Sequence, residues 1–206
     1  MLKLYSAKAA ERIIARYGAW IETLSARYAM PNACLKAILF SELTAIDALD
    51  LVADALVQIN QQRKDAVTIG AQGFLKKTDS STGYAQIFAF VAINAINFAA
   101  DRGLTSYAAL GLPSDHRLDP AALPDLRLVW DRLHREPEFN LEAAALNLLS
   151  AAEEMTGRID FASYTPEELK LIFTRYNGNF RDVSPYGEAA YGHYLRYAEG
   201  EKGSLV

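Results

Sequence analysis

Ala-Cys-Leu-Lys-Ala-Ile-Leu-Phe-Ser-Glu-Leu-Thr-Ala-Ile-Asp-Ala-Leu, residues 33 to 49, predicts a buried helix, because its apolar side chains recur at helical spacing. The apolar stripe of this segment consists of Leu35, Ile38, Leu39, Ile46 and Leu49. Glu42 lies three, four or seven residues from each of them and therefore falls on the same stripe. The pattern predicts one carboxyl group among aliphatic side chains.

A carboxylate that is unpaired among aliphatic groups resists ionisation. We therefore expect the pKa of Glu42 to rise toward the range in which the carboxyl group can give a proton to a leaving oxygen, as a general acid does. The alternative is that Glu42 lies at the edge of the stripe with its carboxylate in water, or pairs with a buried arginine. The catalytic interpretation requires that other parts of the chain converge on Glu42.

Composition indicates a folded globular chain. With 206 residues, 51% hydrophobic and 22% charged, we expect one compact domain with a sizeable core. The net charge of −4 argues against binding to duplex nucleic acid, which needs a basic face. The single cysteine, Cys34, excludes an intramolecular disulfide and a cysteine-rich zinc site.

The first twelve residues, Met-Leu-Lys-Leu-Tyr-Ser-Ala-Lys-Ala-Ala-Glu-Arg, carry charges where a signal peptide needs an apolar run. No later apolar run reaches membrane-spanning length. We therefore expect synthesis in the cytoplasm without a signal peptide and without membrane insertion. The protein would reach a target outside the membrane only by a non-classical export route, and the sequence identifies neither a secretion partner nor an inhibitor.

Helical periodicity recurs along the rest of the chain. It predicts helices over about 6–28, 123–134, 141–155 and 166–176, a helix that ends near Asp101, and a last helix from 184 onward. The apolar run over 49–59 either continues the helix that carries Glu42 or follows a kink. Thr165 and Glu168 form a capping-box pattern, and Asn140 is a predicted helix cap. Asp54 is expected on a solvent-exposed helix face, and His134 is expected at the surface. Residues 63–81 predict a loop or small hairpin.

Five motifs then follow one another in a distinctive order. They are Ser41-Glu42, Gly83-Tyr84-Ala85-Gln86-Ile87, Phe139-Asn140-Leu141, Arg175-Tyr176-Asn177-Gly178, and Tyr191 in the closing helix. This order resembles the soluble lytic transglycosylase and goose-type lysozyme group of the lysozyme-like superfamily, over about residues 33–197. The resemblance implies a mainly α, lysozyme-like single domain over 1–206, with an N-terminal helix in 1–30 and a catalytic core in 31–200.

The resemblance also implies an activity on peptidoglycan. It makes the chain a glycosidase that cleaves the β-1,4 bond between N-acetylmuramic acid and N-acetylglucosamine, with Glu42 as general acid and then base. It places Gly83, Tyr84 and Gln86 against an N-acetyl sugar. Tyr176 and Asn177 would orient Glu42 or the substrate, and Tyr191 would pack under the site. The glycan strand of the cell wall is the implied partner, and the implied reaction needs no metal and no organic cofactor.

Some features depart from the family pattern and leave alternatives open. Leu43 stands where the family has a serine, Ala85 replaces a methionine, and Gly83 lies 41 positions after Glu42. Asp79 is either a second catalytic carboxylate, which would make the enzyme a hydrolytic muramidase, or a loop or cap residue, which would leave a lytic transglycosylase. A catalytically inactive glycan-binding or regulatory protein is the alternative function, and chitin is an alternative substrate.

Overall fold

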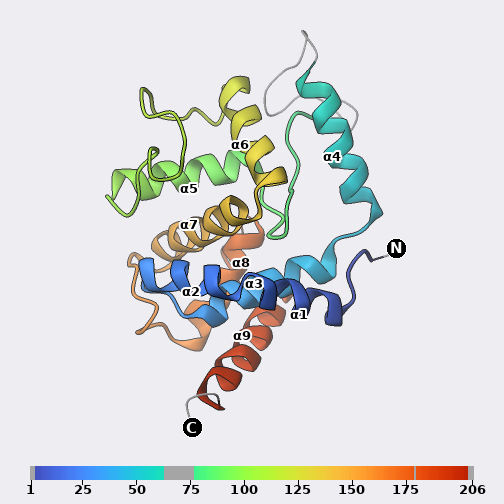
Figure 1. Cartoon of the computed structure of the whole chain (residues 1–206). Coiled ribbons are helices and arrows are strands. Elements are labelled where there is room, and N and C mark those ends of the chain that lie inside the picture. Colours follow the sequence, from blue (N-terminus) through green and yellow to red (C-terminus); the bar gives the residue numbers. More distant parts are fainter. Residues whose placement is uncertain (1–2, 63–76, 179, 204–206) are drawn as a thin grey trace. The chain divides into compact units, whose positions relative to one another are not determined.

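The computed structural model describes residues 3–62, 77–178 and 180–203, which are mainly α-helical (Figure 1). The helices in these ranges are α1 (Ala7–Arg16), α2 (Gly18–Arg27), α3 (Asn32–Ala45), α4 (Ala48–Gln61), α5 (Ala89–Asp101), α6 (Leu123–Arg135), α7 (Pro137–Thr156), α8 (Pro166–Asn177) and α9 (Pro185–Gly203). The same ranges contain isolated β-bridges but no strand. The mainly α prediction is therefore confirmed. The hairpin predicted at about 63–81 falls largely on 63–76, outside the described residues.

The chain divides into two compact units. The first unit consists of Met1–Leu4 and Ile46–Leu146, and the second consists of Tyr5–Ala45 and Asn147–Val206. Helix α7 contributes residues to both units. The single-domain organisation stays a prediction. No helix in the described ranges combines the length and the apolar character that crossing a membrane requires.

Helix α3 is the central helix of the second unit. It packs against α1, α2 and α9, and α8 packs against α9. Because neighbours cover α3 on several sides, most of its residues are buried, including Leu35, Ile38 and Leu39. Burial of each such side chain stabilises the fold by about 1.5–3 kcal/mol. The predicted buried stripe is confirmed over these residues.

The prediction that the buried stripe extends to Leu49 is wrong. Helix α3 ends at Ala45, and Leu49 lies in α4 with 55% of its surface exposed. The physical reason is a new helix start at Asp47, whose side chain accepts a hydrogen bond from the Leu49 amide at 2.8 Å. Asp50 accepts one from the Asp47 amide at 2.8 Å, which completes a capping box. The chain therefore changes helix before Leu49.

The helix predicted over 6–28 is two helices, α1 and α2. The Ser6 side chain caps α1 by accepting a hydrogen bond from the Ala9 amide at 3.3 Å. Tyr17 leaves helical geometry with φ −99° and ψ 13°, and Gly18 then begins α2. Glycine is a poor helix former, so the break occurs where helix propensity is lowest.

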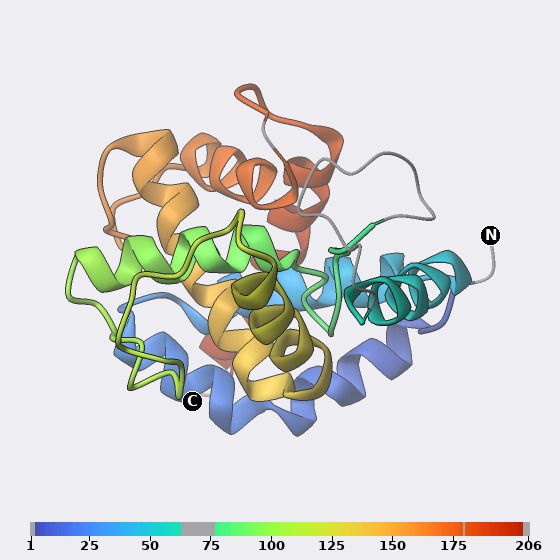
Figure 2. The ribbon, with the colours of Figure 1, turned by 90° about the horizontal axis from the view of Figure 1, so that it is seen from above.

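In the first unit, α5 packs against α6, and residues 77–88 run between α4 and α6 (Figures 1 and 2). Two side chains at the end of α4 bind the start of this segment. Asn60 Nδ2 donates to the Lys77 carbonyl and Gln61 Nε2 donates to the Thr78 carbonyl, both at 2.9 Å. Helix α4 therefore supports the segment that leads into the Gly83 turn.

Candidate active site

Glu42 is the one acidic residue of α3, and it is 8% exposed. Its Oε1 accepts a hydrogen bond of 2.5 Å from the hydroxyl group of Tyr186, in the first turn of α9. Because α9 packs against α3, this bond joins two helices of the second unit. The expected burial of Glu42 is confirmed, and the donor hydroxyl fixes the orientation of its carboxyl group.

The phenol groups of two tyrosines interact with the charge of this carboxyl group. Burial raises the pKa of Tyr186 well above the ordinary value, and the negative charge of Glu42 raises it further. Burial and the charge of Glu42 raise the pKa of Tyr176, in α8, for the same reasons. Both phenols therefore stay protonated at neutral pH, and Tyr186 remains a hydrogen-bond donor. The structure thus brings the predicted residues Glu42 and Tyr176 together.

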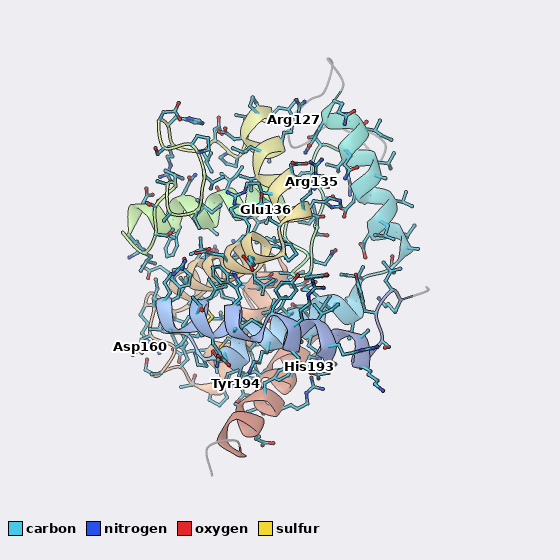
Figure 3. The ribbon with its side chains drawn as sticks, in the orientation of Figure 1. Arg127, Arg135, Glu136, Asp160, His193 and Tyr194 are labelled. Atoms are coloured by element: carbon cyan, nitrogen blue, oxygen red, sulfur yellow. The ribbon has the colours of Figure 1, made fainter. Side chains whose placement is uncertain are left out.

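The other predicted residues of the second unit have different surroundings. Asn177 ends α8 and is exposed. The Tyr191 ring stacks on Tyr194 with centroids 5.8 Å apart, and Lys170 Nζ lies 5.6 Å from the Tyr191 centroid. Figure 3 labels Tyr194 on α9. The tyrosine that donates a hydrogen bond to Glu42 is Tyr186, which sequence reasoning did not single out. The packing role predicted for Tyr191 under the site stays a prediction.

In the first unit, residues 82–87 form a closed turn. The amide of Thr82 donates to the carbonyl of Ile87, and the amide of Ile87 donates to the carbonyl of Thr82, both at 3.2 Å. Inside the turn, Gln86 Nε2 donates to the Gly83 carbonyl at 2.8 Å. Gln86 also has φ 44°, a left-handed conformation that costs a non-glycine residue about 1 kcal/mol. Such strain persists where neighbouring bonds impose it and is typical of ligand-binding turns.

Asn140 holds this turn through both ends of its carboxamide. Its Oδ1 accepts from the Ala85 amide at 2.8 Å, and its Nδ2 donates to the Thr82 carbonyl at 3.0 Å. Gly83 has φ 71°, and a Cβ atom there would press on Asn140 and lie 2.6 Å from the Leu133 carbonyl oxygen. The prediction of Asn140 as a helix cap is wrong, because α7 begins earlier, at Pro137. The side chain is thereby free to fix the turn instead.

Asp79 caps α5 from outside the helix. Its Oδ1 accepts from the Ala89 amide at 2.9 Å, and its Oδ2 accepts from the Phe90 amide at 3.0 Å. Burial raises the pKa of Asp79 to about 6, although these backbone donors act against the rise. Both carboxylate oxygens serve the first amides of α5, which lack partners within the helix. The second-carboxylate role predicted for Asp79 stays a prediction.

Sequence reasoning missed a polar cluster around Asp54. This residue is 7% exposed, so its predicted place on a solvent-exposed face is wrong. Its carboxylate accepts from Ser80 at 2.7 Å and from Thr82 at 2.8 Å. His134 bonds Thr82 at 2.9 Å, although it was expected to be an isolated surface residue. Each partner lies far along the chain, so local periodicity carried no signal for the cluster.

A polar pocket of about 490 Å³ lies between α4 and α6. Gln58 and Gln61 of α4 and Trp130 of α6 contribute to its lining. Arg127 and Arg135, also on α6, line it as well (Figure 3). None of the predicted site residues lines this pocket.

Across the described ranges, no cluster of three or more histidine, cysteine or acidic side chains has a geometry that could hold a metal ion. The described residues thus contain two separate candidate clusters, the Glu42 cluster within the second unit and the 82–87 turn within the first. Comparison of the chain with protein-family models, with curated proteins and with solved structures found no match.

Proposed function

We propose that this chain has a lysozyme-like fold and cleaves the β-1,4 bond between N-acetylmuramic acid and N-acetylglucosamine in peptidoglycan. The observation that carries the proposal is the buried Glu42 carboxyl group, held by the hydroxyl of Tyr186 between α3 and α9. A fixed, buried carboxyl group is suited to transfer a proton to a glycosidic oxygen. The order of the sequence motifs supplies the substrate class.

The contacts of Asp79 favour a reaction with one catalytic carboxylate. Glycoside hydrolysis ordinarily uses two carboxyl groups, but both Asp79 oxygens are engaged by backbone amides of α5. In the one-carboxylate route, Glu42 protonates the bridging oxygen while its bond to C1 breaks. The Glu42 carboxylate then takes the proton of the sugar's own 6-hydroxyl, whose oxygen bonds to C1. The product is a 1,6-anhydro sugar, as a lytic transglycosylase forms.

The 82–87 turn is the proposed sugar-binding element. Backbone groups near Gly83 and Tyr84, with the Gln86 carboxamide, offer donors and acceptors of the kind that an acetamido group needs. The closed turn, the Asn140 contacts and the left-handed Gln86 support this role, because each fixes the backbone before a ligand binds. Tyr176 would orient Glu42, while Asn177 and Tyr191 remain proposed substrate contacts.

The test is digestion of purified peptidoglycan by the wild-type protein and by the Glu42→Gln variant. Glu142→Gln is the matched control, because Glu142 is also buried and also helical but belongs to α7. We expect soluble muropeptides from the wild-type protein and the control, and none from Glu42→Gln. Equal release by Glu42→Gln, or binding of glycan without any release by the wild-type protein, contradicts the proposal.

A further inference from the structure

The Asp54 carboxylate receives two hydroxyl donors in the interior of the first unit. Ser80 Oγ donates to Oδ1 at 2.7 Å, and Thr82 Oγ1 donates to Oδ2 at 2.8 Å. Burial raises the pKa of Asp54, while these two hydrogen bonds and the nearby His134 act against the rise. When Asp54 is ionised, the single hydrogen of each hydroxyl group is donated to a carboxylate oxygen and cannot be donated to another acceptor.

The hydrogen bond from Thr82 to Asp54 determines which nitrogen of His134 carries the proton. His134 Nδ1 is 2.9 Å from Thr82 Oγ1 and 3.4 Å from Asp54 Oδ2. A hydroxyl group has a single hydrogen, so a threonine that donates to Asp54 can only accept from the imidazole. Nδ1 must therefore carry a hydrogen, and in the neutral ring Nε2 is then unprotonated.

A second series of hydrogen bonds leads from Trp130 through Ser80 to the same carboxylate. The indole Nε1 donates to Ser80 Oγ at 3.1 Å, and the rings of Trp130 and His134 stack with centroids 4.8 Å apart. An indole N–H can only donate, so Ser80 always accepts from Trp130. The stacked indole also holds the plane of the imidazole ring.

The other imidazole nitrogen has no hydrogen-bond partner among the residues that the structure describes, and the His134 side chain is 31% exposed. The ring lies beside the proposed sugar-binding turn. Its partner Thr82 directly precedes Gly83, and the carbonyl of Leu133 faces the space where a Gly83 side chain would be. An oriented acceptor is therefore present next to that turn.

We propose that His134 is a substrate-binding residue whose Nε2 accepts a hydrogen bond from a hydroxyl or acetamido N–H group of the glycan. In this arrangement Asp54, acting through Thr82, is a positioning residue that holds the imidazole as the Nδ1–H tautomer. The identity of the ligand rests on the proposed function, whereas the tautomer follows from the hydrogen bonds alone. Helix α4, which carries Asp54, thereby contributes to ligand binding.

The tautomer is measurable by long-range ¹H–¹⁵N NMR correlation at pH 8, above the ordinary titration range of imidazole. We expect a protonated Nδ1 and an unprotonated Nε2 in the wild-type protein. In Asp54→Asn, an amide oxygen that faces Ser80 preserves the hydrogen bonds from Trp130 to Ser80 and from Ser80 to residue 54, and it turns the amide NH₂ toward Thr82. The Thr82 hydrogen then loses its carboxylate acceptor and becomes available to Nδ1, so we expect the tautomer to change to Nε2–H. A wild-type Nε2–H tautomer, or no inversion in Asp54→Asn, overturns the positioning role.

Titration with an N-acetylglucosamine oligomer tests the ligand role of His134. We expect the His134 Nε2 resonance to move on binding. His134→Asn keeps a donor for Thr82 and loses the acceptor, so affinity should fall about five- to tenfold, as for one lost hydrogen bond. His134→Gln, which can place its amide oxygen near the Nε2 position, should restore part of the affinity.

The outcomes separate the two proposals. If the oligomer shifts resonances of the 82–87 turn but not those of His134, the ligand role of His134 is wrong and the proposed function stands. If the oligomer shifts no resonance and Glu42→Gln does not change peptidoglycan digestion, the proposed function and the ligand role both fail. The tautomer result is decided in either case, because it needs no ligand.

Discussion

The hydroxyl group of Tyr186 donates a hydrogen bond to Oε1 of Glu42 at 2.5 Å, across the contact between α9 and α3. The two residues are 144 positions apart in the chain. A buried carboxyl group that accepts a hydrogen bond from a buried phenol is held in one orientation. The proposed proton transfer from Glu42 to a glycan needs a carboxyl group of fixed orientation, and this hydrogen bond supplies one.

Replacement of Tyr186 by Phe removes the donor and leaves the ring. We expect kcat/KM on peptidoglycan to fall about ten- to hundredfold, because a hydrogen bond to a charged group is worth about 1.5–3 kcal/mol. The donor favours the ionised carboxylate, so its loss should move the alkaline limb of the pH–activity profile to higher pH. Tyr197→Phe is the control, because the Tyr197 hydroxyl bonds a different glutamate, Glu11, at 3.1 Å. Equal profiles for the two variants would show that Tyr186 does not act on Glu42.

Replacement of Gly83 by Ala should destabilise the fold more than the same change at Gly103. Both glycines have positive φ, 71° and 66°, which costs alanine about 1 kcal/mol at either position. A Cβ atom at Gly83 also presses on Asn140 and on the backbone of Leu133, whereas none lies within 4 Å at Gly103. We expect an additional loss of about 1–3 kcal/mol for Gly83→Ala, measured by urea unfolding. Similar losses in both variants would contradict the tight contact between Gly83 and Asn140.

The pKa of Asp79, raised from 3.8 to about 6, predicts a pH-dependent stability. Between these values the folded protein binds a proton that the unfolded chain has released, so stability is lost as pH rises through this window. The difference corresponds to about 3 kcal/mol. Relative to Asp79→Asn, which cannot ionise, the wild-type protein should therefore become less stable between pH 4 and pH 6. The free energy of unfolding of both proteins, measured at intervals of pH, checks this. If the unfolding free energies of the two proteins change in parallel with pH, the raised pKa of Asp79 is contradicted.

Helices were predicted correctly where they depend on contacts between residues that are close in the sequence. Thr165 and Glu168 form the capping box that their spacing indicates, and α8 follows it. The buried stripe of α3 also followed from its period of apolar residues. At Asp47 the periodicity placed Leu49 on the apolar stripe and did not decide between a continuous helix and a kink, whereas a capping box formed by Asp47 and Asp50 begins a new helix there.

Contacts between distant residues could not be predicted in the same way. Asp54 lies at a position that a periodicity argument assigns to solvent, yet its partners Ser80 and Thr82 follow 26 and 28 residues later. His134 lies a further 52 residues beyond Thr82. Tyr186 and Tyr191 are equally aromatic in the sequence, and only the packing of α9 on α3 selects Tyr186 as the partner of Glu42.

The mass of the soluble fragments released from peptidoglycan tests the central claim most directly. If Glu42 is the single proton-transferring carboxyl group, the wild-type protein releases fragments that end in an anhydro sugar and so lack one water, and Glu42→Gln releases none. Fragments of the same mass and yield from Glu42→Gln would contradict the account. Fragments that all carry a hydrated reducing end would assign the chemistry to a second carboxylate and contradict the one-carboxylate route.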